Sequence, residues 1–240
     1  MADSLRGREI VLAGGSGGLG SATAELLAAE GARLVVSYRA NEERASRLRD
    51  LAQIVRADLG SANDRKQLLD AAPALYGLVV FSGNPSRVTD LSGLEEVMRR
   101  SHEVNYLGPI LLAREAAARM KDKSTPGAIV LFSTMQAVSL FAGSTAYASP
   151  KLALLHAARI LAKECRGRAN IRVNVVCPGV TAAGMAEASI ASGKYDRYLN
   201  EGMICRFGRA IDVARAVRFF LEPDNYVTGQ VLTVDGGLTL

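Results

Sequence analysis

Residues 9–30 read EIVLAGGSGGLGSATAELLAAE, and the order of the parts within this segment is the main evidence for the fold. Its first five residues form a short apolar run typical of a buried strand, and its last ten have the apolar spacing of a helix. Between them, Gly14, Gly18 and Gly20 allow a tight turn and a close approach of the backbone to a ligand. N–H groups at such a turn, together with the following helix N-terminus, favour a pyrophosphate. The stretch therefore indicates nucleotide binding, with a plain tight turn as the alternative.

The remainder of the chain repeats this alternation of strand and helix. Strands are predicted at residues 9–13, 33–37, 53–57, 78–81, 128–132, 171–176 and 230–234. Helices are predicted at residues 21–30, 42–50, 64–72, 94–120, 147–165 and 212–221. Such alternation predicts an α/β protein, namely a single-domain Rossmann fold over residues 1–240. Its doubly wound sheet would have seven parallel strands and helices on both faces.

The amino-acid composition and charge exclude several classes of function for this chain. The 240 residues are 49% hydrophobic and 22% charged, which suits one domain with a well-buried core. The net charge is +5, but 29 basic and 24 acidic residues are interspersed, so no nucleic-acid partner is expected. Three cysteines and two histidines at unrelated spacings predict no metal site and a reducing, cytoplasmic location. We expect no signal peptide and no membrane span, because polar residues and proline interrupt the uncharged segment 124–150.

A second stretch, residues 133–151, reads STMQAVSLFAGSTAYASPK and carries candidate chemistry. Tyr147 and Lys151 are four positions apart and would share one helix face. A free phenol has a pKa of about 10, and a neighbouring ammonium favours the phenolate and lowers that pKa. Such a phenol can exchange a proton with an alcohol or a carbonyl near neutral pH. Thr134, at the end of the preceding strand, would add a hydroxyl; an ordinary Tyr–Lys contact on a helix is the alternative.

Taken together, these features resemble the classical short-chain dehydrogenase/reductase family over nearly the whole chain, particularly its 3-oxoacyl-[acyl-carrier-protein] reductase-like members. The matching residues are Gly14, Gly18, Gly20, Asp58, Asn105, Tyr147, Lys151, Pro178, Gly179 and the tail VTGQVLTVDGG at 227–237. The resemblance implies an oxidoreductase that interconverts a carbonyl and a secondary alcohol with a nicotinamide dinucleotide. It further implies a small-molecule carbonyl or alcohol substrate and a homo-oligomer, either a tetramer or a dimer.

The resemblance also assigns residue roles. Tyr147 would be the general acid and base, Lys151 would bind the nicotinamide ribose and lower the pKa of Tyr147, and Asn105 would hold a water that relays protons. Thr134 falls at the family's serine and would hold the substrate oxygen. The implied cofactor-binding residues are Gly14, Ser16, Gly18, Leu19, Gly20, Arg39, Asp58, Leu59, Ser82, Gly83, Tyr147, Lys151, Pro178, Gly179 and Val180.

Two residues bear on the adenosine end of the cofactor. Arg39 follows the second strand, and no acidic residue appears before Glu42. A cation at this position pairs with a 2′-phosphate, whereas a carboxylate would accept from a free 2′-hydroxyl, so NADP(H) is favoured over NAD(H). A solvated surface arginine is the alternative. Asp58, after the third strand, would accept a hydrogen bond from the adenine amino group or, alternatively, cap a helix.

Four departures from the family pattern leave a second hypothesis open, namely a cofactor-binding module without catalysis. Ala13 replaces a threonine whose hydroxyl ties down the glycine turn, and residues 80–83 lack a sheet-stabilising asparagine. Thr134 replaces the family serine, with Ser133 as the fallback. Pro150 stands between Tyr147 and Lys151, where proline is tolerated only in a first helical turn.

Pro150 therefore predicts a helix that either starts near Ala148 or Ser149 or bends locally. The segment 180–208 is predicted to be a substrate lid, in which three glycines suit mobility and Met185, Tyr195 and Met203 either line the pocket or pack the lid. The two histidines, His102 and His156, are expected to be structural.

Overall fold

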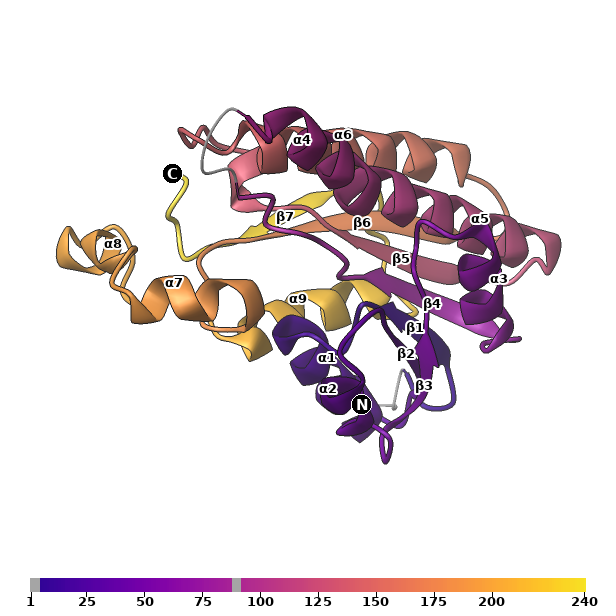
Figure 1. Cartoon of the computed structure of the whole chain (residues 1–240). Coiled ribbons are helices and arrows are strands. Elements are labelled where there is room, and N and C mark those ends of the chain that lie inside the picture. Colours follow the sequence, from indigo (N-terminus) through magenta and orange to yellow (C-terminus); the bar gives the residue numbers. More distant parts are fainter. Residues whose placement is uncertain (1–4, 88–91) are drawn as a thin grey trace.

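The computed structural model describes residues 5–87 and 92–240, and its centre is one parallel sheet (Figure 1). Seven strands are hydrogen-bonded in the order β3-β2-β1-β4-β5-β6-β7. They are β1 (Glu9–Ala13), β2 (Arg33–Tyr38), β3 (Ala52–Arg56), β4 (Leu75–Val80), β5 (Gly127–Phe132), β6 (Ile171–Pro178) and β7 (Val231–Val234). The order reverses direction between β1 and β4, as in doubly wound sheets. The predicted single-domain, seven-stranded Rossmann fold is confirmed, although residues 1–4 lie outside the described residues.

Helices connect the strands. The long ones are α1 (Gly18–Ala29), α3 (Ala62–Asp70), α4 (Leu94–His102), α5 (Gly108–Asp122), α6 (Thr145–Glu164) and α9 (Ala210–Leu221). Short ones are α2 (Glu42–Ser46), α7 (Glu187–Ala191), α8 (Asp196–Asn200) and the 3₁₀ turns η2 (Met135–Ala137) and η3 (Gly184–Ala186). The helix predicted at 94–120 is interrupted by a π-helical turn, η1 (Glu103–Leu107), and the one predicted at 42–50 ends at Ser46.

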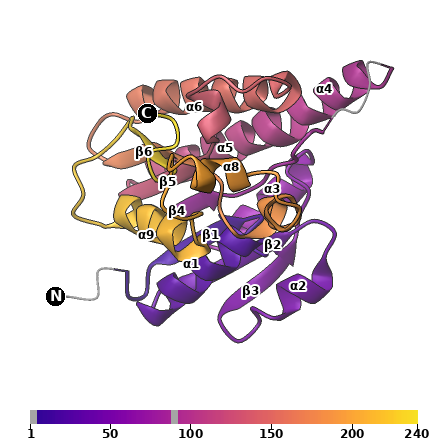
Figure 2. The same cartoon turned by 90° about the vertical axis from the view of Figure 1, so that its left-hand side faces the viewer.

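Two apolar layers enclose the sheet. α1 and α9 lie together on one face, and α5 and α6 cover the other (Figures 1 and 2). On the first face, Leu12 of β1 packs in one buried cluster with Leu27 and Val217. On the second, Leu131 of β5 clusters with Leu154 of α6. Because both faces are covered, β4 and β5 are buried along their whole length, as a parallel sheet requires.

At the carboxyl ends of the strands the chain forms the loops that matter for function. Parallel strands end at the same edge, and the reversal between β1 and β4 leaves a crevice there in which ligands of such folds bind. The segment that follows β6, with α7 and α8, projects beyond the sheet on that side (Figure 1). None of the helices within residues 5–87 and 92–240 has the length and apolar character that crossing a membrane would require.

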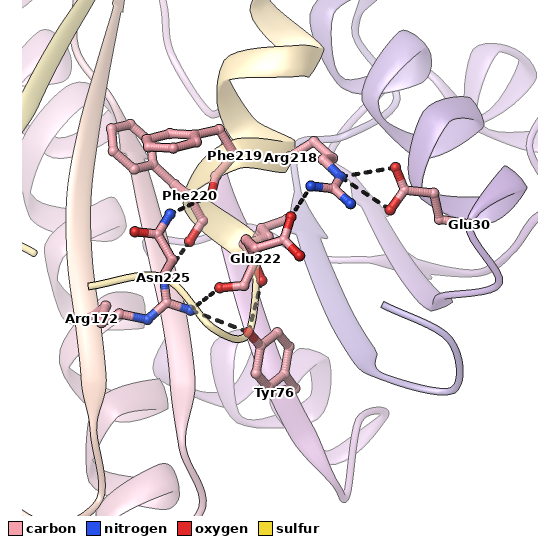
Figure 3. Close-up of polar contacts among 9 residues, drawn as sticks. Glu30, Tyr76, Arg172, Arg218, Phe219, Phe220, Glu222 and Asn225 are labelled. Atoms are coloured by element: carbon pink, nitrogen blue, oxygen red, sulfur yellow. Dashed lines mark hydrogen bonds and ion pairs between the residues drawn. The ribbon is translucent and has the colours of Figure 1, made fainter. Parts of the chain in front are cut away.

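A polar anchor holds the end of α9 against β6 (Figure 3). Arg172, which is only 3% exposed, donates to the carbonyls of Phe220 at 2.9 Å and Glu222 at 2.8 Å and to the Tyr76 hydroxyl at 3.2 Å. Tyr76 in turn donates to the carbonyl of Leu221 at 2.7 Å. The last carbonyls of a helix lack intrahelical partners, so these donors complete the C-terminus of α9. We refer to Arg172, Tyr76 and these three carbonyls as the α9 anchor.

Candidate active site

A cavity of about 1480 Å³ extends along the carboxyl edge of the sheet. Its walls come from the glycine turn after β1, the loops after β2, β3 and β4, the start of α6 and the segment after β6. The predicted site residues that line it are Gly14, Ser16, Gly18, Leu19, Gly20, Arg39, Asp58, Leu59, Ser82, Gly83, Thr134, Tyr147, Lys151, Pro178, Gly179 and Val180. The predicted site residue that does not line it is Asn105.

The glycine turn is held by a hydroxyl from the neighbouring strand. Gly14 has a φ of +70°, and a Cβ there would lie 2.9 Å from Ser82 Oγ, so a larger residue would be strained. The Gly14 N–H donates to Ser37 Oγ at 3.0 Å. Ser37, for which the sequence gives no such signal, thus supplies the kind of hydroxyl that Ala13 lacks.

Lys151 is a buried cation at the floor of the cavity. It is 2% exposed, and its Nζ donates to the carbonyls of Phe132 at 2.8 Å and Ser82 at 3.1 Å. Burial disfavours the ammonium and lowers the pKa of Lys151 to about 8, an effect that the nearby Cys177 partly opposes. The side chain is therefore fixed by backbone oxygens at the ends of two adjacent strands.

Tyr147 lies beside Thr134. Burial raises the pKa of Tyr147 to about 12, and the hydrogen bond with the Thr134 hydroxyl acts in the opposite direction. The expected lowering of this pKa by Lys151 is therefore wrong for the free protein. The physical reason is that desolvation of the buried phenol is the largest effect and outweighs the lowering by Thr134, while the Lys151 Nζ is hydrogen-bonded to the carbonyls of Ser82 and Phe132.

The two candidate hydroxyls at the end of β5 point in different directions. Thr134 contacts Tyr147 and accepts from the Gln136 N–H at 3.3 Å. Ser133 is buried and donates to the backbone carbonyl of Lys151 at 2.9 Å. The geometry therefore brings Thr134, and not the fallback Ser133, to the phenol.

Beneath them lies Cys177, a buried thiol that the sequence analysis did not assign to the site. Burial raises its pKa to about 11, and hydrogen bonds with the Ser133 side chain and the Thr134 backbone act in the opposite direction. A thiol with this pKa stays protonated at neutral pH, so it fills space and is not a nucleophile there.

Asn105 is fully buried behind the loop that follows β4. Its Oδ1 accepts from the Asn84 N–H at 2.9 Å, and its Nδ2 donates to the Asn84 carbonyl at 3.0 Å and to Ser101 Oγ at 2.9 Å. A Cβ on Gly83 would lie 3.2 Å from Asn105 Oδ1 and 3.5 Å from Lys151 Nζ. The side-chain amide therefore holds the loop that separates it from Lys151.

α6 carries Tyr147 and Lys151 on one face despite the intervening proline. The helix begins at Thr145, so the expected start near Ala148 or Ser149 is wrong, and Pro150 lies in the second turn. Ser144 supports the first turn because its carbonyl accepts from the N–H groups of Tyr147 at 2.9 Å and Ala148 at 2.7 Å.

Comparisons with known proteins agree with this geometry. A family model described as Enoyl-(Acyl carrier protein) reductase matches residues 13–239. The 3-oxoacyl-[acyl-carrier-protein] reductase of Rattus norvegicus is 34% identical over 95% of this chain and 96% of its own. The chain belongs to the short-chain dehydrogenase/reductase family. Membership of this family makes it an oxidoreductase that acts on CH–OH and C=O groups with a nicotinamide dinucleotide.

Two further relatives show the range of this family. The chloroplastic NADPH-dependent aldehyde reductase 2 of Arabidopsis thaliana is 29% identical over 98% of this chain and 95% of its own. A 7 alpha-hydroxysteroid dehydrogenase solved with NADH and 7-oxo glycochenodeoxycholic acid is 29% identical. It superposes with a TM-score of 0.89 and covers 99% of this chain and 97% of its own. Similar dehydrogenase/reductase chains thus differ in the substrates and cofactors named for them.

The α1 end of the cavity fits the pyrophosphate of the family's dinucleotide. The first helical hydrogen bond of α1 is donated by Ser21 to the Gly17 carbonyl at 2.8 Å. The N–H groups of Gly18, Leu19 and Gly20 precede it and lack intrahelical partners, and their residues line the cavity. Such N–H groups and the helix dipole favour a pyrophosphate at this end of the cavity.

At the adenosine end, arginines outnumber carboxylates. Arg39 is exposed and lines the cavity, as does Arg44 in α2, which the sequence analysis did not select. Asp58 also lines the cavity, where its Oδ1 accepts from the Gly60 N–H at 2.9 Å. The helix-cap alternative for Asp58 is wrong, because the cap of α3 is Ser61.

The segment 180–208 closes on itself at its base. The Ala182 N–H donates to the Gly208 carbonyl at 2.8 Å, and the Gly208 N–H donates to the Val180 carbonyl at 2.9 Å. Within it, Met185 lines the cavity, whereas Met203 does not. A small apolar cluster formed by Met135, Val180, Tyr198, Ile204 and Leu238 packs the segment against the domain.

Tyr195 of this segment both lines the cavity and packs against that cluster, so it lines the pocket and packs the segment at the same time. His102 and His156 are exposed and do not line the cavity. In the part of the chain that the structure describes, no three His, Cys, Asp or Glu side chains come together as metal ligands.

Proposed function

We propose that the protein is an NADP(H)-dependent oxidoreductase that interconverts a carbonyl and a secondary alcohol, with Tyr147 as the proton donor and acceptor. The supporting observation is that Tyr147, Thr134 and Lys151 line the same cavity as the first turn of α1. That arrangement combines a phenol, a hydroxyl and a cation with a pyrophosphate site. The family's nicotinamide dinucleotide, when bound, supplies or accepts the hydride.

The roles of the side chains follow from their contacts. Thr134 holds the substrate oxygen next to the Tyr147 hydroxyl. During carbonyl reduction, Tyr147 gives its proton to the developing alkoxide, and the Thr134 hydroxyl stabilises the phenolate that remains. A phenol whose pKa burial raises to about 12 is protonated at neutral pH, so the free enzyme is prepared for reduction. The Lys151 ammonium also binds the nicotinamide ribose hydroxyls.

The preference for NADP(H) rests on Arg39 and Arg44. Both line the cavity after β2, where a 2′-phosphate is recognised in this fold. Guanidinium groups bind phosphate oxygens in a bidentate manner.

We further propose that the enzyme is cytoplasmic and forms a homo-oligomer, either a tetramer or a dimer, with segment 180–208 as its substrate lid. Leu152 on α6 is 49% exposed, and Ile160 on the same helix is exposed as well. Burial of these side chains against a second copy would remove apolar surface from water. Light scattering after size exclusion gives the oligomeric mass directly.

The decisive experiment is Tyr147→Phe, which keeps the ring and removes the proton. Turnover of aldehydes, ketones and 3-oxoacyl thioesters with NADPH should fall by at least about a thousandfold, while NADPH affinity stays within about twofold. Near-normal turnover by this variant would contradict the proposal. NADPH binding by the wild type without turnover of any carbonyl in the panel would support the alternative, a cofactor-binding module.

A further inference from the structure

Pro150 removes one hydrogen bond from the helix that carries the proposed proton donor. In the second turn of α6, residue 150 would normally donate its N–H to the carbonyl four positions earlier, that of Ala146. Proline has no N–H, and its ring crowds that carbonyl. Ala146 is buried, so its carbonyl needs another donor to avoid an unsatisfied polar group.

Ser101 of α4 supplies that donor. Its Oγ lies 2.5 Å from the Ala146 carbonyl oxygen, although the two residues are 45 positions apart in the sequence. A carbonyl only accepts, so the hydroxyl proton of Ser101 is committed to Ala146. Its lone pairs then accept from Ser86 Oγ at 2.7 Å and Asn105 Nδ2 at 2.9 Å. A serine hydroxyl offers one donor and two acceptors, and all three are used.

We propose that Ser101 is a positioning residue that replaces the hydrogen bond removed by Pro150. Ala146 immediately precedes Tyr147, so the Ser101 contact fixes the turn from which the phenol projects. The same hydroxyl accepts from Asn105, and it therefore joins the loop after β4 to the start of α6. This assignment rests on the proposed function, in which Tyr147 transfers the proton.

A double-mutant cycle tests this assignment. Pro150→Ala restores an N–H that can reach the Ala146 carbonyl, so the Ser101 contact becomes dispensable. With Pro150 present, Ser101→Ala should lower kcat about tenfold, because Ala146 loses its donor. In the Pro150→Ala background the same change should lower kcat by less than about threefold. The Kd for NADPH should stay within about twofold throughout, because Ser101 does not line the cavity.

Ser86→Ala is the matched control. Ser86 belongs to the same network but does not contact Ala146, so Pro150→Ala should not reduce the effect of losing its hydroxyl. If Ser101→Ala folds poorly, Ser101→Cys retains the shape with a weaker donor and should show the same rescue at smaller amplitude. An equal loss of kcat on removing the Ser101 hydroxyl in the wild-type and Pro150→Ala backgrounds would overturn the assignment.

A second measurement separates this proposal from the proposed function. The shift in urea-unfolding midpoint caused by Ser101→Ala should be smaller in the Pro150→Ala background than in the wild-type background, whether or not the protein turns over a carbonyl. A rescue of stability in an inactive protein would keep the hydrogen-bond replacement and reject the proposed function. Absence of rescue in an active protein would reject the hydrogen-bond replacement and keep the proposed function.

Discussion

Two of the buried cations in residues 5–87 and 92–240 lie at different places in the molecule and are bound by uncharged oxygens. Lys151 is 2% exposed and donates to two backbone carbonyls, and Arg172 is 3% exposed and donates to two carbonyls and a tyrosine hydroxyl. A third buried cation, Arg65, instead pairs with the Glu115 carboxylate at 2.9 Å. Burying a charge without a counter-ion is unfavourable, so the first two positions each need an explanation.

The difference between them is access to the cavity. Lys151 and its partners Ser82 and Phe132 line the cavity, whereas Arg172 and the α9 anchor do not. Burial is also the main cause that lowers the pKa of both cations. A perturbed cation therefore identifies an active site only when it also faces a space that a ligand can enter.

The largest expected effect comes from Lys151→Met. The change should lower kcat/KM for carbonyl reduction by about a hundredfold to a thousandfold, since the cation proposed to bind the nicotinamide ribose is lost. At pH 7 the free energy of unfolding should change by less than about 1 kcal/mol, because cavity water can bind the freed carbonyls and a desolvated charge is removed. Steady-state kinetics and urea unfolding measure the two quantities. A large loss of stability with little loss of activity would make Lys151 structural.

Arg172→Met should lower the stability of the protein and leave its activity nearly unchanged, the opposite of Lys151→Met. Without the guanidinium, the buried carbonyl of Phe220 and the partly buried carbonyl of Glu222 lose a donor. The free energy of unfolding should fall by about 2–4 kcal/mol, while kcat per folded molecule stays within about twofold. Tyr76→Phe removes one hydroxyl of the same anchor and should show a smaller loss of the same kind. A fall in kcat without a fall in stability would break the comparison.

The contrast between these regions also shows what the sequence could predict. Most strands were predicted to within a few residues, because buried parallel strands are short apolar runs. Sixteen predicted site residues line the cavity because parallel strands end at one edge, so residues that follow different strands meet there.

What the sequence could not reveal depends on pairings between distant residues. Ser37 ties the glycine turn only because β1 and β2 pair with Leu12 opposite Val36, a register that no local pattern gives. Ser101 of α4 reaches the Ala146 carbonyl of α6, a contact between residues 45 positions apart that no local pattern gives. The sequence also does not show how deeply Tyr147 is buried, and burial is the main cause that raises its pKa.

A pH titration of stability sharpens the comparison. Burial lowers the pKa of Lys151 to about 8, below the value of about 10.4 in an unfolded chain. Between these two pKa values Lys151 is protonated in the unfolded chain but largely neutral in the folded protein. The free energy of unfolding therefore rises with pH in this range. Below pH 8 the buried lysine is charged, and its destabilising effect is at its maximum. From pH 7 to 9.5 the unfolding free energy of the wild type should therefore gain on the order of 2 kcal/mol relative to Lys151→Met.

The control is the same titration of Arg172→Met against the wild type. Guanidinium groups keep their proton over this range, so the difference between these two proteins should be flat. Measurements stop at pH 9.5 because burial raises the pKa of Tyr147 to about 12, and that group opposes the trend above about pH 10. A flat difference for Lys151→Met as well would mean that the lysine is solvated in the folded protein.

The smallest expected effect concerns an exposed cation. Arg39 lines the cavity at the end of β2, and its charge has no burial to overcome. Arg39→Ala should raise the Kd for NADPH about tenfold and leave the Kd for NADH within about twofold, because a 2′-phosphate occurs in NADPH alone. Arg44→Ala should act in the same direction. Arg47, exposed nearby but outside the cavity and paired with Glu43, is the matched control, and Arg47→Ala should change neither Kd. An equal loss for both dinucleotides on Arg39→Ala would remove the argument for NADP(H), since the arginine would then contact a part that the two cofactors share.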